Sequence, residues 1–433
     1  MSDGAIYCAE DSPAAGLATG LSWIWRLGPV RSRPDPAACG FGTAAEAGVL
    51  SDLVAAGGLA AAVILCGDAG AGEGPVPPRR RTGGIPRFDG GTRVRGDFTL
   101  FEAGEPAVAS TLGTHAVVDG GTLMVGIDPD RDWGRLDSFW AYEAIAAHLE
   151  LRIDRPLAKL PAIGCLRLDD TPGTAQHQLE ERAKGDAQQS RRLRALAANL
   201  RDEGAVLNVA VCAQALEGGR RVPLEQVWPD SVEALRDGIG MGAYETICHG
   251  LLHLDPDALE RGEVEYTEFA RLDAATAADH LDGALDWQSR VLARPTVFVA
   301  PAWSYGPAAD AAGADRGLVR WYRARPGPLL DEGRFYETLI GELLGLYKLD
   351  YTPLQRLAAL GIPPVIAMHG ALLDGRLASL KAHREYALLA RLLVKRDVRR
   401  LAELDGIRWV GAGELIEELA AHTGTDRLGP AAW

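Results

Sequence analysis

The stretch that decides the fold is GCLRLDDTPG, residues 164–173, in which a short apolar run leads into two adjacent acids and then into Pro-Gly. Such a run predicts a buried strand that ends at Asp169 and Asp170. Two neighbouring carboxylates at a buried position repel each other unless a cation or a proton resolves the repulsion. We therefore predict a metal site here; the alternative is that the two acids only cap a helix or form a turn.

The best partners for these acids are His249 and His253 in CHGLLHLDP, which again follow an apolar, β-favouring run, residues 244–248. A spacing of four residues on one helical turn brings both imidazoles to one side. Two neutral histidines and one carboxylate form the usual facial ligand set for a catalytic zinc or a similar divalent ion. The alternative is a pair of surface histidines, but the occurrence of both motifs at predicted strand ends favours the metal site.

The composition is that of an ordinary globular protein. The 433 residues are 47% hydrophobic and 24% charged, which indicates two domains, or one large barrel with an extension. The formal net charge of −14 disfavours nucleic acid and anionic lipid as the main partner. A small or neutral substrate fits better. The quaternary state is open, and a homo-oligomer is one of the options.

Cysteine usage and the N-terminus indicate a cytoplasmic protein. No Cys-x-x-Cys pair occurs, and scattered cysteines in apolar runs are typical of reduced, buried thiols. The first residues, MSDGAIYCAEDSPAAG, lack the basic and apolar regions of a signal peptide. Apolar runs such as GLAAAVILCG fall far short of the about 20 residues that cross a membrane. We therefore expect no contact with a membrane.

The first part of the chain, residues 1–155, predicts an N-terminal extension followed by a small α/β domain. Residues 1–45 are expected to be irregular, with Trp23 and Trp25 either forming a docking segment or packing onto a neighbouring domain. A helix and a strand are expected over 46–66, two strands over 114–128 and a helix over 136–150. Residues 71–93 are rich in Pro, Gly and Arg and predict a long loop. Its run Arg79–Arg81 either binds an anion or is a solvated charge run.

The second part, residues 156–433, predicts repeated βα units. Alternation of buried apolar strands with amphipathic helices indicates a parallel sheet, and this many repeats suit a closed or nearly closed (β/α) barrel. In such a barrel the chemistry collects where the strands end. The expected strands are residues 163–168, 205–213, 244–248, 296–302, 363–370 and 407–412, and the expected helices are residues 187–202, 231–238, 274–292, 378–396 and 414–422.

The order of these motifs resembles the polysaccharide deacetylase family, also called carbohydrate esterase family four or the NodB-homology fold. LRLDDTPG resembles its first motif, an apolar strand ending in Asp-Asp, and YETICHGLLH resembles its second, with Glu245 four residues before His249. IAMHG, with Met368 and His369, resembles the last motif. The resemblance covers about residues 160–420. It implies a distorted (β/α)7 barrel of the deacetylase type behind the additional N-terminal domain.

The chain departs from the family pattern in three places. The third motif normally reads Arg-x-Pro, and its arginine orients the catalytic acid, but VAPAWSYGP has Val299 in the place of that arginine. Ala367 is smaller than the leucine expected two residues before His369. The fourth motif, whose aspartate tunes the histidine, has no counterpart that we can place. These departures indicate a divergent branch and keep a catalytically silent relative among the alternatives.

The resemblance implies a role for each matching residue. Asp170, His249 and His253 would be the metal ligands, with Zn²⁺ as the first candidate and Co²⁺, Ni²⁺, Mn²⁺ or Fe²⁺ as alternatives. Asp169 would be the general base and His369 the general acid; for His369 the alternative is a core histidine.

Two aromatic residues lie just beyond the strand that ends near Pro301. From the residues themselves, the rings of Trp303 and Tyr305 could stack on a sugar or another cyclic substrate, or simply pack in the core. A backbone N–H in loop 302–305 could help to hold an oxyanion.

The predicted function is that of a metal-dependent amide hydrolase. The resemblance favours an N-deacetylase that acts on an amino sugar or a small acylated metabolite, so the expected partner is a small-molecule or oligosaccharide substrate. A second enzymatic alternative is hydrolysis of another C–N bond, in an amide or a cyclic amide. The alternative from another class is a pseudoenzyme, or a carbohydrate- or metabolite-binding protein, that keeps the barrel without turnover.

Overall fold

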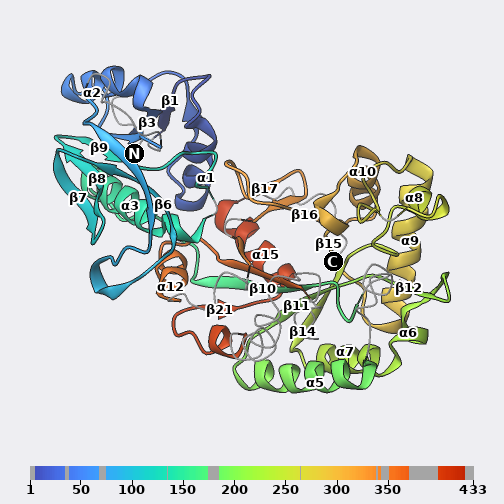
Figure 1. Ribbon diagram of the computed structural model, residues 1–433. Helices are drawn as coiled ribbons and strands as arrows, with labels where there is room; N and C mark the ends of the chain where they lie inside the picture. The colour runs from blue at the N-terminus through green and yellow to red at the C-terminus, as the bar shows by residue number, and fades with distance from the viewer. Residues whose placement is uncertain are drawn as a thin grey trace.

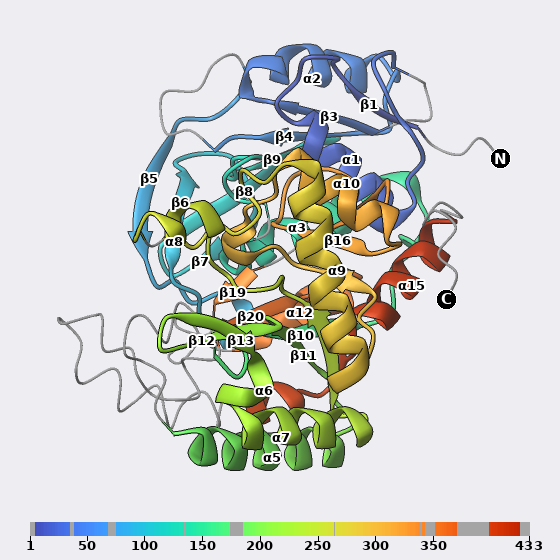
Figure 2. The ribbon, with the colours of Figure 1, turned by 90° about the vertical axis from the view of Figure 1, so that its right-hand side faces the viewer.

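The computed structural model describes residues 5–34, 39–67, 75–133, 135–173, 185–263, 265–337, 340–342, 351–369 and 398–424. Over these ranges the chain is an α/β protein with two large sheets (Figures 1 and 2). Parallel and antiparallel pairs both occur in the first sheet, and most neighbouring strands of the second run parallel. The predicted α/β class is thereby confirmed.

The first sheet is built from the N-terminal part of the chain. Its strand order is β2-β1-β3-β4-β9-β8-β6-β5, with β7 beside β8. The central strand β4, with the sequence AAVIL, is buried along its whole length, as expected for a parallel strand covered on both faces. The elements are β1 (Ile6–Cys8), α1 (Ala15–Trp25), β2 (Val30–Arg31), β3 (Cys39–Thr43), α2 (Ala47–Ala55), β4 (Ala61–Leu65), β5 (Arg79–Gly84), β6 (Gly96–Phe101), β7 (Glu105–Ser110), β8 (Gly113–Asp119), β9 (Thr122–Val125) and α3 (Phe139–Ile153).

The prediction of an irregular segment over residues 1–45 was wrong, because β1, α1, β2 and β3 lie in it. The glycines of α1 serve close packing: a Cβ on Gly16 would come 2.7 Å from Pro326, and one on Gly20 would come 2.6 Å from Trp133. Trp25 is buried, and its indole N–H donates to the Leu360 carbonyl at 2.8 Å. For Trp25, the packing interpretation is therefore confirmed.

The prediction of a loop over residues 71–93 was also wrong in part, because β5 lies in it. This strand pairs antiparallel with β6, for example Arg81 with Thr99. Its low strand propensity is overridden by that pairing, and charged side chains are common on strands at the edge of a sheet.

The second sheet carries the predicted βα units. Its strand order is β17-β18-β16-β15-β14-β11-β10-β20-β19, and β21 also pairs with β10. Each predicted strand overlaps an observed one, and each predicted helix except 378–396 overlaps an observed one; 378–396 lies outside the described residues. The strands are β10 (Ile163–Asp169), β11 (Leu207–Val211), β14 (Tyr244–Cys248), β15 (Val297–Phe298), β16 (Val319–Tyr322), β17 (Leu330–Asp331), β18 (Arg334–Tyr336), β19 (Ile340–Glu342), β20 (Val365–His369) and β21 (Arg408–Trp409).

Helices surround the second sheet (Figures 1 and 2). They are α5 (Asp186–Asp202), α6 (Leu224–Val227), α7 (Pro229–Gly240), α8 (Pro256–Glu260), α9 (Ala274–Val291), α10 (Pro307–Asp315), α12 (Thr352–Ala359) and α15 (Ala412–Thr423), and a hairpin of β12 (Gln214–Glu217) and β13 (Arg220–Pro223) lies between β11 and α6. Helices α5 and α7 lie side by side (Figures 1 and 2). The two sheets share a hydrophobic core, in which α1 residues such as Leu21 belong to one cluster with Trp321 and Leu415.

Two features relate to the predicted cytoplasmic location: the state of the cysteines and the length and polarity of the helices. All six cysteines are buried and unpaired: Cys8, Cys39, Cys66, Cys165, Cys212 and Cys248. In the described ranges, every helix is too short or too polar to cross a bilayer. The cytoplasmic location stays a prediction.

Candidate metal centre

Strand β10 brings the two acids to the site. It is buried over its whole length and lies between β11 and β20, with the backbone of Asp169 in register with that of His369 on β20. Asp170 follows the strand with a φ of +60°, a left-handed conformation that turns the chain sharply where the ladder ends. The two acids are therefore fixed by the backbone at the carboxyl end of a central strand.

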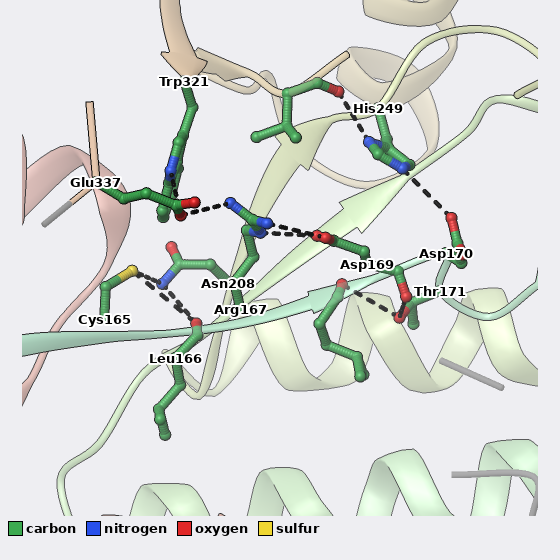
Figure 3. A network of polar contacts seen from close by, with 12 residues as sticks. Cys165, Leu166, Arg167, Asp169, Asp170, Thr171, Asn208, His249, Trp321 and Glu337 are labelled. Atoms are coloured by element: carbon green, nitrogen blue, oxygen red, sulfur yellow. Dashed lines mark hydrogen bonds and ion pairs between the residues drawn. The ribbon is translucent and has the colours of Figure 1, made fainter. Parts of the chain in front are cut away.

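Asp170, His249 and His253 meet at one point, as predicted. The Asp170 Oδ1 lies 3.3 Å from the His249 Nε2 and 3.1 Å from the His253 Nε2, and the three side chains are almost fully buried. The close-up shows the His249 ring directed at Asp170 (Figure 3). In the described residues these three form the one group of candidate ligand atoms within 4.8 Å of one another.

The conformation of the His-x-x-x-His motif differs from the prediction. The two histidines were expected on one helical turn, but they lie in an irregular loop after β14. The loop has positive φ angles of 91° at Gly250 and 70° at His253, and the two imidazole rings lie with their centroids 5.2 Å apart. The convergence was thus predicted correctly, but for the wrong geometric reason.

The three ligand atoms fit a small divalent cation. Two atoms that each lie about 2.0–2.1 Å from one ion are about 3 Å apart in tetrahedral or octahedral coordination. The observed separations of 3.1 and 3.3 Å match this spacing. The His249 Nδ1 lies 2.8 Å from the Val299 carbonyl, so Nδ1–H donates there and leaves the Nε2 lone pair facing the site. Burial lowers the pKa of His253, but the charge of Asp170 and the hydrogen bond to it outweigh burial and raise the pKa.

Backbone strain is concentrated around this centre. Four of the seven non-glycine residues with positive φ in the described part of the chain are Asp170, His253, Ala302 and Trp303. Each such residue costs roughly 1–3 kcal/mol and persists only where the surrounding structure holds it. At these four residues the backbone therefore adopts a locally unfavourable conformation, which the surrounding structure holds in place together with the side chains of the site.

Asp169 is held by a residue that the sequence analysis missed, Arg167 on the same strand. The Arg167 Nε and Nη2 donate to the two oxygens of Asp169 at 2.8 and 3.0 Å (Figure 3). Arg167 is fully buried, and its guanidinium carbon lies 4.5 and 4.7 Å from the ring centroids of Trp303 and Trp321. The signal was available, because residues two apart on a strand point to the same face.

A second buried carboxylate contacts the same arginine. The Glu337 Oε2 lies 3.4 Å from the Arg167 Nη1 and accepts a hydrogen bond from the Trp321 indole at 3.1 Å (Figure 3). Burial raises the pKa of Glu337 to about 7, and Arg167 and Trp321 offset this only in part. The Arg167 guanidinium thus contacts two carboxylates, and its two-pronged hydrogen-bonded pair is with Asp169.

Two further predicted residues, Trp303 and Tyr305, lie near this network. Trp303 is half-buried and packs on Arg167, whereas the Tyr305 hydroxyl lies 2.7 and 3.0 Å from the carbonyls of Phe298 and Trp321. Their role in substrate binding stays a prediction. The His369 side chain lies outside the described residues, so its predicted role is also untested.

Glu245 of the second motif does not join the metal centre. It accepts a hydrogen bond from the Gly413 N–H at 2.8 Å, in the first turn of α15.

Comparison with known proteins finds structural likenesses alone. No family model and no curated protein matches the sequence. A family 4 carbohydrate esterase from Streptomyces lividans has 13% identity and a TM-score of 0.32, over 58% of this chain and 93% of that one. A putative polysaccharide deacetylase from Mycobacterium smegmatis has 14% identity and a TM-score of 0.38, over 61% and 96%. A family 4 pseudoenzyme from Bacillus anthracis has 9% identity and a TM-score of 0.33, over 60% and 66%.

These solved structures come from the same family that the three sequence motifs resemble. At these TM-scores, the chemistry of the site follows from its own residues and not from the neighbours.

Proposed function

We propose that this chain is a divergent member of the polysaccharide deacetylase family and a metal-dependent hydrolase. The observation that carries the proposal is the convergence of Asp170, His249 and His253, with Asp169 beside them in a bidentate pair with Arg167. The proposed organisation is a distorted (β/α)7 barrel over residues 156–433, preceded by an extension and a small α/β domain over residues 1–155.

Asp170, His249 and His253 would hold the ion, with Zn²⁺ as the first candidate and Co²⁺, Ni²⁺, Mn²⁺ or Fe²⁺ as alternatives. When bound, a divalent ion of this kind acidifies water to a pKa of about 7 and polarises a carbonyl. The site is buried, which strengthens electrostatic interactions within it.

Asp169 is the proposed general base, which takes the proton of the attacking water. A carboxylate has about four lone-pair positions, and Arg167 uses two of them. The fork of the guanidinium fixes the plane of the carboxylate, so the remaining lone pairs have a defined direction. Arg167 therefore orients Asp169 in place of the third-motif arginine, whose position Val299 occupies in this chain. This favours an active enzyme over a silent relative.

His369 is the proposed general acid, which protonates the leaving nitrogen. Its support is the register of β20 with β10, which sets the backbone of His369 beside that of Asp169. Trp303 and Tyr305 are the proposed contacts to the substrate, an amino sugar, an oligosaccharide or a small acylated metabolite. Hydrolysis of another amide or cyclic amide needs the same groups and is the alternative within this class.

The test combines metal analysis with activity. We expect about one divalent ion per chain, lost in His249→Ala and kept in the control His422→Ala, whose residue lies on α15. Release of acetate from N-acetylated amino sugars should be lost in Asp169→Asn. A chain that binds no divalent ion contradicts the proposal. A chain that binds metal while Asp169→Asn leaves turnover unchanged, or while no acylated substrate is turned over, supports the non-catalytic alternative.

A further inference from the structure

The loop that carries His253 is closed around one buried carboxylate. The backbone N–H groups of Leu251, Leu252 and His253 all donate to Glu268, at 3.0, 3.1 and 2.8 Å. Glu268 is fully buried. We infer that Glu268 is a positioning residue that sets the place of the His253 ligand. This inference deepens the proposed function and rests on it.

The loop is wrapped tightly on this carboxylate. Successive N–H groups that point to one side form a concavity for an anion, and here the anion is the protein's own side chain. A Cβ on Gly250 would come 2.6 Å from the Glu268 Oε2, so the approach requires glycine there. The left-handed backbone at His253 costs roughly 1–3 kcal/mol. The three charge-assisted hydrogen bonds to Glu268 offset that cost.

Glu268 is itself held by His280 on α9. The His280 Nδ1 lies 2.8 Å from the Glu268 Oε1, and the ring packs edge-on against Phe269. His280 is buried as well. The three backbone N–H groups of residues 251–253 and the His280 ring all donate to the Glu268 carboxylate, which has only acceptor positions when ionised. A glutamine at 268 would place an amide NH₂ against N–H donors.

The two histidine ligands are held in different ways. The His249 ring is oriented by its own Nδ1, which donates to the Val299 carbonyl. In the described part of the chain, the His253 Nδ1 has no hydrogen-bond partner on another residue. Apart from the contact of its Nε2 with Asp170, the His253 ring is therefore directed by its backbone, and that backbone is held by Glu268.

The experiment compares Glu268→Gln with Glu263→Gln, a control at an exposed position that, like Glu268, lies between α8 and α9. Zn²⁺ affinity is measured by competition with a chromophoric chelator, and the visible spectrum of bound Co²⁺ reports the ligand geometry. We expect Glu268→Gln to weaken Zn²⁺ binding about 10- to 100-fold, the effect typical of groups that orient metal ligands. Amide exchange at residues 251–253 of the metal-free protein should also become faster, and the control should match the wild type in all three measurements.

A second pair of variants keeps the test decisive if Glu268→Gln does not fold. His280→Asn retains an N–H donor near the position of Nδ1, whereas His280→Leu removes it, so only the leucine variant should lose Zn²⁺ affinity. Equal affinity in the wild type and a folded Glu268→Gln variant overturns this inference alone, as does equal affinity in the two His280 variants. A wild-type chain that binds no Zn²⁺ or Co²⁺ overturns the proposed function and this inference together.

Discussion

The bidentate pair between Arg167 and Asp169 leads to the sharpest prediction. Replacing Arg167 by Met leaves Asp169 buried without its counter-ion, because only 6% of Asp169 is exposed. Removing one partner of a buried ion pair costs about 3–5 kcal/mol. We expect the free energy of unfolding, measured in urea by circular dichroism, to fall by about that amount.

Arg167→Lys separates charge from orientation. Lysine keeps the positive charge but lacks the planar fork, so one of the two hydrogen bonds to Asp169 is lost. A hydrogen bond to a charged group contributes about 1.5–3 kcal/mol. If that energy holds the base in the transition-state geometry, kcat should fall about tenfold to a hundredfold, with KM nearly unchanged.

The matched control is Arg316→Lys. Arg316 also makes a two-pronged pair, with Asp282, but that aspartate is 58% exposed. An exposed pair contributes about 0–1 kcal/mol, so neither unfolding nor kcat should change measurably. Our account of Asp169 is refuted if Arg167→Lys folds normally and keeps the kcat of the wild type.

Three further predictions concern buried polar groups outside the ligand set. Burial raises the pKa of Glu337 to about 7, so its contribution to stability is present below pH 4.5 and is lost as the pH rises through 7. The free energy of unfolding in urea should therefore fall by about 3 kcal/mol between pH 5 and 8, and Glu337→Gln should abolish that fall. Burial lowers the pKa of His115 to about 4, so its contribution to the free energy of unfolding is present above pH 6.5 and is lost as the pH falls through 4. Melting curves of the wild type should show this acid destabilisation of about 3 kcal/mol, and those of His115→Phe should lack it. Asn208 donates to the carbonyls of Leu166 and Val410 and accepts from the Ala412 N–H, so Asn208→Leu should lower the free energy of unfolding by about 3 kcal/mol or more, and a loss below 1 kcal/mol would contradict this role.

Local sequence determined the elements of the site because its signals are short-range. Apolar runs at 163–168 and 244–248 predict strands wherever they lie in a chain, and polar residues that directly follow them must lie at strand ends. Asp169, Asp170 and His249 could therefore be named as candidates, and His253 joined them because of its spacing of four from His249. The N-terminal helix α1 escaped the same reasoning, because its glycines are explained only by Pro326 and Trp133, far away in the chain.

By itself, then, the sequence determined which residues end the buried strands and which of them have the chemistry of metal ligands. Apart from the Arg167–Asp169 pair, only the tertiary structure decided how those side chains are held, because the other holding contacts join residues far apart in the chain. Glu337 reaches Arg167 across 170 positions, and the Val299 carbonyl accepts from His249 across 50. The tertiary structure also replaced the expected helical turn with a loop of positive φ angles. A backbone so strained forms only when buried partners compensate for its cost, and no local pattern records those partners.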